Sequence, residues 1–336
     1  MKVCIITEGN SDIGYGHITR CTSLYQAFEE KGIEPFFIVN GDENVKNTLN
    51  TKRNCIFNWL INTDKLFGII NGSDIVVLDS YLATLLLYKK ISEVIKIPVF
   101  IDDNLRLEYP PGVVVNYSIS AKKIKYHNRE NINYLLGPKY CLVRNEFWNV
   151  QNKIESDEIK TIMITLGGSD TKNLTPPILE MLNTLFPNLE KKVIVGMGFK
   201  NIDNIEAVLD KNCELIYFPT AEDMKKVMRE SDLAITAGGT TIYELAIIGV
   251  PAISVAVADN QLNNVKAFSE LGINYFAGWW QDENLFENIK KFISLLKNKE
   301  RRKKMVISGQ KHIKSDGSRS IIEYILNKLN GKSSFE

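Results

Sequence analysis

The stretch DLAITAGGTTIYELAIIGVPAISVAV, residues 232–257, contains two apolar runs separated by a glycine pair and a helix-forming segment. The runs predict buried strands over 232–236 and 251–257. The segment between them predicts a helix over 240–248. A strand, a helix and a second strand in this order are typical of a parallel sheet with helical crossovers, so the stretch predicts an α/β architecture.

The same alternation extends over the whole chain. In the first half, apolar runs predict strands over 2–7, 34–40, 74–80, 97–103 and 112–118. In the second half, the further strands are predicted over 161–166, 192–196 and 213–218. Helices are expected between the strands of the first half, and in the second half over 173–186, 202–210, 221–230, 260–271, 283–297, 299–313 and 318–329. The chain is therefore expected to contain two doubly wound parallel sheets.

A polar stretch between Glu146 and Lys160 separates the two halves. It predicts an N-terminal Rossmann-like domain over 1–148 and a C-terminal Rossmann-like domain over 158–317. A last helix and tail over 318–336 could pack back on the N-terminal domain. Two such domains are expected to face each other across a cleft lined by the carboxyl ends of their strands, where sheets of this type bind ligands.

Composition excludes several classes of protein. With 41 basic and 40 acidic residues among 336, the chain has no excess charge for a nucleic-acid partner. No run approaches the roughly 20 apolar residues of a membrane span, so we expect a cytoplasmic protein without membrane insertion. Five scattered cysteines lack CxxC spacing, which argues against disulfides and structural zinc. No metal and no cofactor are predicted, and the oligomeric state is not predicted.

Two glycine pairs in the second half could bind an anion. GGSD (167–170) and GGTT (238–241) both follow predicted strands, and each carries hydroxyl residues. Glycine lets backbone approach a ligand closely, and a helix start presents N–H groups and a positive dipole end, so a diphosphate fits there. Glu244, three residues after Thr241, could accept hydrogen bonds from a ribose, or it could only stabilise the helix dipole.

The glycine loop of the first half carries a histidine and does not match a phosphate-binding motif. DIGYGHITRC, residues 12–21, lacks the P-loop GK[ST] and a complete GxGxxG, which argues against a nucleoside triphosphatase and against a dehydrogenase. His17 is expected at a helix N-terminus, where the dipole favours the neutral ring that a general base requires, although a hydrogen bond within the loop is the alternative. Arg20 could add positive field or pair with a carboxylate.

Three more polar side chains follow strands of the first half. Tyr81 follows the strand over 74–80, and Asp102 and Asp103 follow the next. An adjacent acidic pair can hold a metal or orient a base, yet most such pairs cap loops.

The motifs resemble those of one family of nucleotide-sugar enzymes. In chain order they are GYGHITR (14–20), LDSY (78–81), IDDN (101–104), VNYS (115–118), YCLVRNEFW (140–148), ITLGGSD (164–170), AGGTTIYE (237–244) and DNQ (259–261). This ordered set resembles the UDP-2,4-diacetamido-2,4,6-trideoxy-β-L-altropyranose hydrolases of pseudaminic acid biosynthesis, grouped with spore-coat polysaccharide biosynthesis proteins. The resemblance implies a GT-B-like fold.

The resemblance also implies an activity and a set of roles. Such enzymes release UDP from a UDP-linked 2,4-diacetamido-2,4,6-trideoxy hexose without a metal, and the free sugar forms with anomeric inversion. By resemblance His17 activates the attacking water, and Tyr81 and Asn260 are catalytic residues that lie beside the sugar or the reacting centre. The other implied substrate contacts are Gly14, Gly16, Arg20 and Asp102 in the first half, and Gly168, Phe218, Gly239, Thr240, Thr241 and Glu244 in the second, with Phe218 near the base and Glu244 at the ribose.

Three other functions fit the same architecture. A GT-B glycosyltransferase would use an alcohol acceptor in place of water, and an apolar acceptor patch in the first half would favour it; the sequence shows no exposed hydrophobic run there. A nucleotide-sugar binding module would not need His17. A sugar-nucleotide 2-epimerase would need acid and base groups on both sides of a ring carbon.

Overall fold

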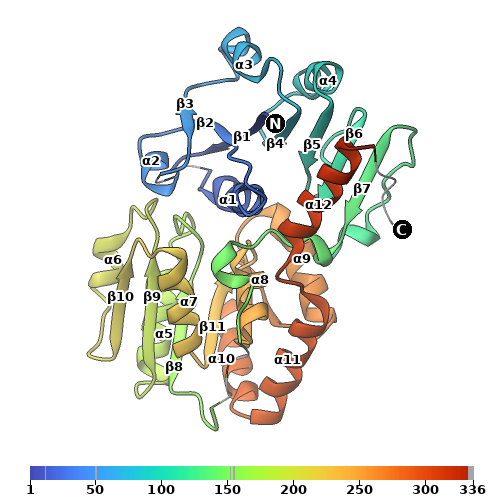
Figure 1. Ribbon diagram of the computed structural model, residues 1–336. Coiled ribbons are helices and arrows are strands. Elements are labelled where there is room, and N and C mark those ends of the chain that lie inside the picture. Colours follow the sequence, from blue (N-terminus) through green and yellow to red (C-terminus); the bar gives the residue numbers. More distant parts are fainter. Residues whose placement is uncertain (12, 50, 152, 154–155, 332–336) are drawn as a thin grey trace. The chain divides into compact units, whose positions relative to one another are not determined.

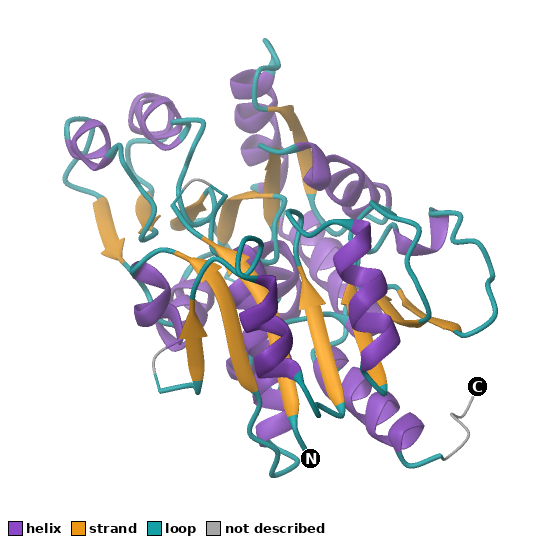
Figure 2. Cartoon of the chain, turned by 90° about the horizontal axis from the view of Figure 1, so that it is seen from above, coloured by secondary structure: helices purple, strands orange, loops and turns teal. Residues whose placement is uncertain are grey.

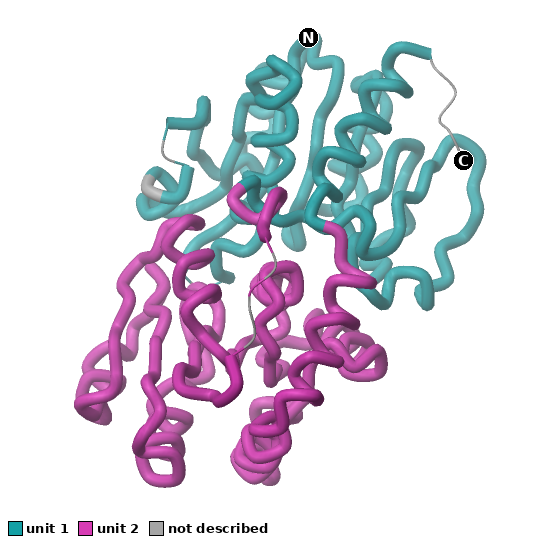
Figure 3. The backbone as a smooth tube through the Cα atoms, turned by 60° about the horizontal axis from the view of Figure 1, so that its bottom comes forward, with its two compact units in different colours: residues 1–145, 315–336 teal, residues 146–314 magenta. Residues whose placement is uncertain are grey.

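The computed structural model describes residues 1–336 except 12, 50, 152, 154–155 and 332–336 (Figure 1). The chain forms two compact units, one of residues 1–145 and 315–336 and the other of residues 146–314 (Figure 3). The sequence analysis places the corresponding limits at 148, 158 and 317. The second unit is therefore inserted, in chain order, between the main part of the first unit and its last helix.

The first unit is built on a seven-stranded parallel sheet in the order β3-β2-β1-β4-β5-β6-β7. Its strands are β1 (Val3–Gly9), β2 (Phe36–Gly41), β3 (Asn54–Ile56), β4 (Ile75–Asp79), β5 (Ile97–Ile101), β6 (Gly112–Asn116) and β7 (Ile132–Leu136). The central strands β1, β4 and β5 are buried along their whole length, which explains their continuous apolar sequences. The strand order reverses between β1 and β4, the position where doubly wound sheets bind ligands.

The helices α1 (Gly16–Glu29), α2 (Asn44–Leu49), α3 (Thr63–Ile70) and α4 (Leu85–Val94) connect the first strands of this sheet. Short 3₁₀ turns follow at η1 (Ala121–Lys123), η2 (Pro138–Tyr140) and η3 (Asn145–Phe147).

The last helix, α12 (Gly317–Leu329), lies beside α1 (Figure 1). The Ser318 hydroxyl donates to Ser23 Oγ over 3.0 Å, and Arg319 pairs with Glu30. Gly317 packs so closely that a Cβ there would lie 2.2 Å from the backbone nitrogen of Cys141.

The second unit is built on a six-stranded parallel sheet in the order β10-β9-β8-β11-β12-β13, with its reversal between β8 and β11. Strands and helices are coloured orange and purple in Figure 2. Its strands are β8 (Thr161–Thr165), β9 (Glu190–Val195), β10 (Cys213–Tyr217), β11 (Leu233–Ala237), β12 (Ala252–Ala256) and β13 (Tyr275–Trp279). Its helices are α5 (Thr175–Leu185), α6 (Ile202–Glu206), α7 (Ala221–Glu230), α8 (Thr241–Ile248), α9 (Asp259–Glu270), α10 (Leu285–Leu296) and α11 (Lys299–His312). The core between sheet and helices is apolar and continuous.

The predicted fold class of two doubly wound parallel sheets is confirmed. Three strands were not predicted, β3, β7 and β13, and each forms an edge of its sheet. Edge strands have only one neighbour, and these carry partly exposed residues in place of a continuous apolar run. The helix predicted over 202–210 was too long, because α6 ends at Glu206 and the chain then turns toward β10.

Candidate active site

The loop after β1 brings His17 to the reversal point of the first sheet. Gly14 adopts a φ of +80°, which glycine tolerates best, and its N–H donates to the Asn10 carbonyl over 2.8 Å. Helix α1 then begins at Gly16, so His17 stands in its first turn as predicted. The His17 ring does not serve to cap this loop, because it reaches across to the end of β4.

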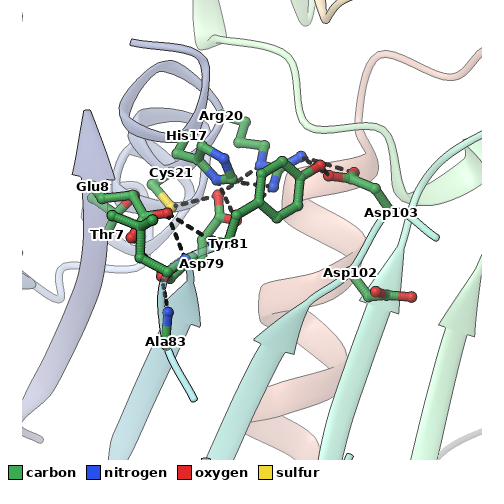
Figure 4. Close-up of polar contacts among 12 residues, drawn as sticks. Thr7, Glu8, His17, Arg20, Cys21, Asp79, Tyr81, Ala83, Asp102 and Asp103 are labelled. Atoms are coloured by element: carbon green, nitrogen blue, oxygen red, sulfur yellow. Dashed lines mark hydrogen bonds and ion pairs between the residues drawn. The ribbon is translucent and has the colours of Figure 1, made fainter. Parts of the chain in front are cut away.

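The His17 ring contacts a buried carboxylate. His17 Nδ1 lies 2.8 Å from Asp79 Oδ1, and Asp79 is fully buried. Arg20, one turn after His17, donates from Nε to Asp79 Oδ2 over 2.6 Å and from Nη2 to Oδ1 over 2.5 Å (Figure 4). Of the two roles left open for Arg20, the structure shows the pairing with carboxylates.

The charge state of Asp79 follows from these contacts. Burial works to raise the pKa of Asp79, but the positive charge of Arg20, together with His17, outweighs burial and holds that pKa well below its ordinary value. Asp79 is therefore a carboxylate and can only accept hydrogen bonds. His17 Nδ1 has two polar neighbours, Asp79 Oδ1 at 2.8 Å and Arg20 Nη2 at 3.1 Å. We assign the proton to Nδ1, because the shorter contact is with the carboxylate, which can only accept. This tautomer leaves the lone pair of the neutral ring on Nε2.

Tyr81 and Asp103 complete the group. The rings of His17 and Tyr81 meet edge to face, with centroids 4.6 Å apart and planes at 89°. The Tyr81 hydroxyl donates to Asp103, which also accepts two hydrogen bonds of 2.8 and 2.9 Å from Arg20 Nη1. Burial works to lower the pKa of Arg20, but the charges of Asp103 and Asp79 outweigh burial and raise that pKa well above its ordinary value. Arg20 therefore remains a cation. One arginine thus links the carboxylate behind His17 to the carboxylate at Tyr81.

Asp102 lies apart from this group (Figure 4). Its buried carboxylate accepts hydrogen bonds from the backbone of Leu105 and Arg106 and from the hydroxyls of Tyr109 and Tyr126. These bonds hold the loop that follows β5. Asp103, not Asp102, contacts Arg20 and Tyr81, and the substrate contact that the resemblance implies for Asp102 stays a prediction.

In the second unit, the glycine loop after β8 packs against the loop after β9. Gly167 has a φ of +90°, and the Gly168 carbonyl accepts a hydrogen bond of 2.9 Å from Gly198 N–H. A Cβ on Gly196 would lie 2.4 Å from that carbonyl, so glycine is required for this approach. The Asp170 carboxylate accepts from the Leu174 and Thr175 amides at the start of α5. These contacts hold the loop in a defined shape at the reversal point of the second sheet.

The second glycine pair stands at the start of α8. Gln261 Oε1 accepts hydrogen bonds from the N–H groups of Gly238 and Val257, at 3.2 and 3.1 Å. It therefore joins the loop after β11 to the loop after β12. Gly239 is exposed, and a Cβ there would meet no atom within 4 Å. The side chain of Thr240, the N-cap residue, makes no cap hydrogen bond to α8. This helix start therefore combines an exposed glycine with the two hydroxyl residues Thr240 and Thr241.

Three other residues of the second unit that the sequence predicts for the site stand after its strands, at the end of β10 or in the first turns of α8 and α9. Glu244 stands in the first turn of α8 and is only 2% exposed, and Asn260 stands in the exposed first turn of α9. Phe218, at the end of β10, is 54% exposed and has a φ of +49°. A bulky residue in the left-handed region stores strain, and such strain is concentrated at functional sites.

Sequence reasoning placed Asp79 and Asp103 at the ends of strands without predicting a partner for either, and it gave Gln261 only as part of the DNQ motif. The partner of Asp79 could not be predicted, because His17 is 62 residues away and the neighbourhood of β1 and β4 is a property of the sheet.

No group of three His, Cys, Asp or Glu side chains within the described ranges is arranged to hold a metal ion. Within the same part of the chain, no helix has the length and apolarity needed to cross a membrane.

The second half of the chain matches the model of a known protein domain. Residues 161–321 match the model of the glycosyltransferase family 28 C-terminal domain. The match covers β8 to β13 and both glycine loops.

Curated relatives align over most of the chain. An uncharacterized protein of Methanocaldococcus jannaschii is 30% identical over 75% of this chain and 55% of its own length. The Helicobacter pylori protein named pseudaminic acid cytidylyltransferase and UDP-2,4-diacetamido-2,4,6-trideoxy-beta-L-altropyranose hydrolase is 26% identical over 81% of this chain and 48% of its own length. The chain thus spans about half the length of these two relatives. Spore coat polysaccharide biosynthesis protein SpsG of Bacillus subtilis is 23% identical over 88% of this chain and 89% of its own length. The resemblance predicted from the motifs is therefore confirmed.

Solved structures show the fold. The Acinetobacter baumannii MurG structure has a TM-score of 0.67 at 14% identity, covering 97% of this chain and 100% of its own. The S. aureus MnaA–UDP structure has a TM-score of 0.70 at 15% identity, covering 100% and 99%. Together with the two parallel sheets, these matches confirm the predicted GT-B-like fold.

Proposed function

We propose that this chain hydrolyses a UDP-linked sugar, releasing UDP and the free sugar without a metal ion. The observation that carries the proposal is the His17–Asp79 pair, which leaves His17 Nε2 as a proton acceptor beside Tyr81. The names of the Helicobacter pylori and Bacillus subtilis relatives support a UDP-linked 2,4-diacetamido-2,4,6-trideoxy sugar and a role in pseudaminic acid or related surface polysaccharide biosynthesis.

The proposed reaction is a direct displacement. His17 Nε2 takes a proton from water as the water oxygen forms a bond to the anomeric carbon. The bond from that carbon to the diphosphate oxygen breaks, and UDP leaves with the electron pair. Attack opposite to the leaving group inverts the anomeric centre. Asp79 would stabilise the imidazolium that forms, as a carboxylate does in catalytic triads.

The second unit would bind the nucleotide. The start of α8, with Gly239, Thr240 and Thr241, presents a helix dipole and backbone to a diphosphate, and Gly168 stands on the adjoining loop. These groups would stabilise the departing phosphate oxygen in place of a metal. In the same proposal Glu244 binds the ribose, Phe218 receives the base and Asn260 lies by the sugar.

One observation favours a transferase as the second candidate. Leu82, in the turn directly after Tyr81, and Leu86, in the first turn of α4, are 46% and 62% exposed. The sequence analysis expected no exposed hydrophobic group of this kind in the first half. A lipid-linked or other apolar acceptor could use it. A Rickettsia felis relative named as an N-acetylglucosamine transferase is 27% identical over 89% of this chain and 92% of its own length.

UDP release from a panel of UDP-sugars, without acceptor and with a chelator, tests the proposal. We expect the wild-type chain and the matched control His127→Asn, whose histidine is exposed, to release UDP, and His17→Asn to lose release. Release by His17→Asn would remove the base assignment. Release only with an alcohol acceptor would establish the transferase, and retention of the anomer by NMR would contradict direct attack by water.

Two further outcomes would select the remaining functions. Tight UDP-sugar binding without turnover, unchanged in His17→Asn, would indicate a binding module. A ring-carbon epimer of the substrate or product would indicate a 2-epimerase.

A further inference from the structure

A second buried carboxylate stands at the reversal point of the first sheet. Glu8, near the end of β1, is completely buried. Its oxygens accept hydrogen bonds from three neutral donors: Tyr81 N–H at 2.7 Å, Leu82 N–H at 3.1 Å and the Ser80 hydroxyl at 2.5 Å. All three donors belong to the turn after β4, more than 70 residues away in the chain.

These bonds define the shape of that turn. Ser80 Oγ, held by Glu8, accepts in its turn from the amides of Leu82 and Ala83, at 3.0 and 2.8 Å. The Ser80 carbonyl accepts from the hydroxyl of the buried Tyr88 and from Arg106. The backbone on both sides of Tyr81 is therefore fixed, and Glu8 is the acceptor at its centre.

The Tyr81 side chain has little burial to hold it. The residue is 36% exposed, and its ring rests against His17 on one side while its hydroxyl donates to Asp103. An exposed aromatic ring keeps one orientation only if its backbone and its polar end are both anchored, because rotamer freedom otherwise favours several. Asp103 anchors the hydroxyl, and Glu8 anchors the backbone.

We propose that Glu8 is a positioning residue for the reaction. Through the Tyr81 amide it sets the Tyr81 ring against His17, and thereby the direction in which His17 Nε2 faces the sugar. The kinetic part of this inference rests on the proposed hydrolysis. The positional part, that Glu8 determines how the two rings meet, does not depend on any activity.

The carboxylate is suited to this task because it only accepts. In Glu8→Gln an amide NH₂ group, which is itself a donor, replaces one carboxylate oxygen. It then faces a donor from which that oxygen accepted a hydrogen bond. The shape of the side chain is retained, but at least one donor of the turn is left without an acceptor, which loosens the turn. Glu8→Gln therefore changes the anchor without creating a cavity.

A kinetic double-mutant cycle tests the first part. We expect Glu8→Gln to lower kcat for UDP release roughly 10- to 100-fold, the range that a small misplacement of reacting groups produces, with KM and UDP affinity unchanged. In a Tyr81→Ala background the same change should have no further effect, since Glu8 acts through Tyr81. The control is Glu108→Gln, whose carboxylate pairs with Arg129 on the surface. Additive effects, or a raised KM with unchanged kcat, would overturn the inference.

NMR of the histidine rings tests the second part without activity. The chain has three histidines, so the His17 signal is identified by its loss in His17→Asn. Because an aromatic ring shifts nearby protons, Tyr81→Ala should move the His17 ring resonances, and Glu8→Gln should move them in the absence of any substrate while His127 stays in place. An unmoved His17 signal in folded Glu8→Gln would overturn the inference.

The two measurements separate the two ideas. If no UDP-sugar is turned over by wild type but the His17 signal moves as expected, the proposed function fails and the positional inference stands. If Glu8→Gln does not fold, Ser80→Ala, which removes one donor to Glu8 and the acceptor of two turn amides, is expected to move the same signal. A shift absent from folded Ser80→Ala would count against the inference.

Discussion

At the scale of single residues, Asp79 is the charge on which the first site depends. It is buried with Arg20 and His17, and its pKa is held below the ordinary value mainly because the charge of Arg20 outweighs the effect of burial. We expect Asp79→Asn to lower the free energy of unfolding at pH 7 by about 3–5 kcal/mol, because a buried cation then loses a partner. Urea denaturation with far-UV circular dichroism measures this, and Asp74→Asn, at a surface pair with Lys96, is the control.

The same carboxylate predicts a pH dependence. A group with a depressed pKa in the folded state adds stability above its unfolded pKa of about 3.9, and this stability is lost as the pH falls through the lower folded value. The difference in unfolding free energy between wild type and Asp79→Asn should therefore be constant from pH 7 to 5 and shrink below about pH 4. A gap that widens on acidification would contradict the charge state assigned to Asp79.

The backbone of Phe218 predicts a difference in stability between two variants, and its ring predicts a loss of UDP affinity in both. Its φ of +49° costs a side chain about 1–2 kcal/mol, and only glycine avoids the cost. Phe218→Gly should therefore be more stable to urea than Phe218→Ala by about 1 kcal/mol, since both lack the ring and only alanine has the strained Cβ. Both should bind UDP more weakly than wild type in calorimetry. Equal affinity in all three would remove Phe218 from the proposed nucleotide site.

The sequence predicted the site unevenly at this scale. His17 and Tyr81 were found because each follows a strand, and the structure brings them together. Asp102 was preferred over Asp103, because two adjacent carboxylates cannot be told apart until the turn after β5 fixes which one points back to Arg20. Glu8 was passed over, because a carboxylate within a buried strand has a meaning only when its donors, 70 residues on, are known.

At the scale of elements, the start of α8 contains two neighbouring glycines with different tasks. A Cβ on Gly238 would lie 2.3 Å from Val265 Cγ1 on α9, whereas one on Gly239 would meet nothing within 4 Å. We expect Gly238→Ala to cost about 1–3 kcal/mol in thermal or urea unfolding, as overpacking does. Gly239→Ala should leave stability within about 0.5 kcal/mol.

The two variants are each other's control for UDP binding. If the start of α8 receives the diphosphate, the methyl group of Gly239→Ala stands where the anion approaches, and UDP affinity falls while the fold is intact. Unchanged UDP affinity in Gly239→Ala would place the anion elsewhere. The sequence could predict α8 itself because its apolar residues are periodic, but the packing of Gly238 on α9 depends on the order of β11 and β12 in the sheet.

At the scale of the whole molecule, the last helix belongs to the first unit although it follows the second in sequence. Its residues Ile321, Ile322 and Ile325 are completely buried. Removing residues 315–336 should therefore abolish the cooperative unfolding transition of the first unit. The truncation loses about 1.5–3 kcal/mol of unfolding free energy for each large apolar side chain that is no longer buried.

Calorimetry can assign the transitions. On the proposed function, UDP at 100 times its dissociation constant should stabilise the transition of the second unit by about 2.7 kcal/mol, in the full chain and in the truncated one. A truncated chain that kept both transitions would show that α12 is dispensable. One that lost both would show that the two units unfold together.

The inserted position of the second unit also determines the order in which the protein can mature during translation. Domains tend to fold as they emerge from the ribosome, the N-terminal one first. Here the strands and helices of residues 1–145 emerge first, yet they must wait through the synthesis of another 169 residues, 146–314, before α12 is available. The face of α1 that α12 covers therefore stays uncovered during that interval, and the second unit can be complete before the first.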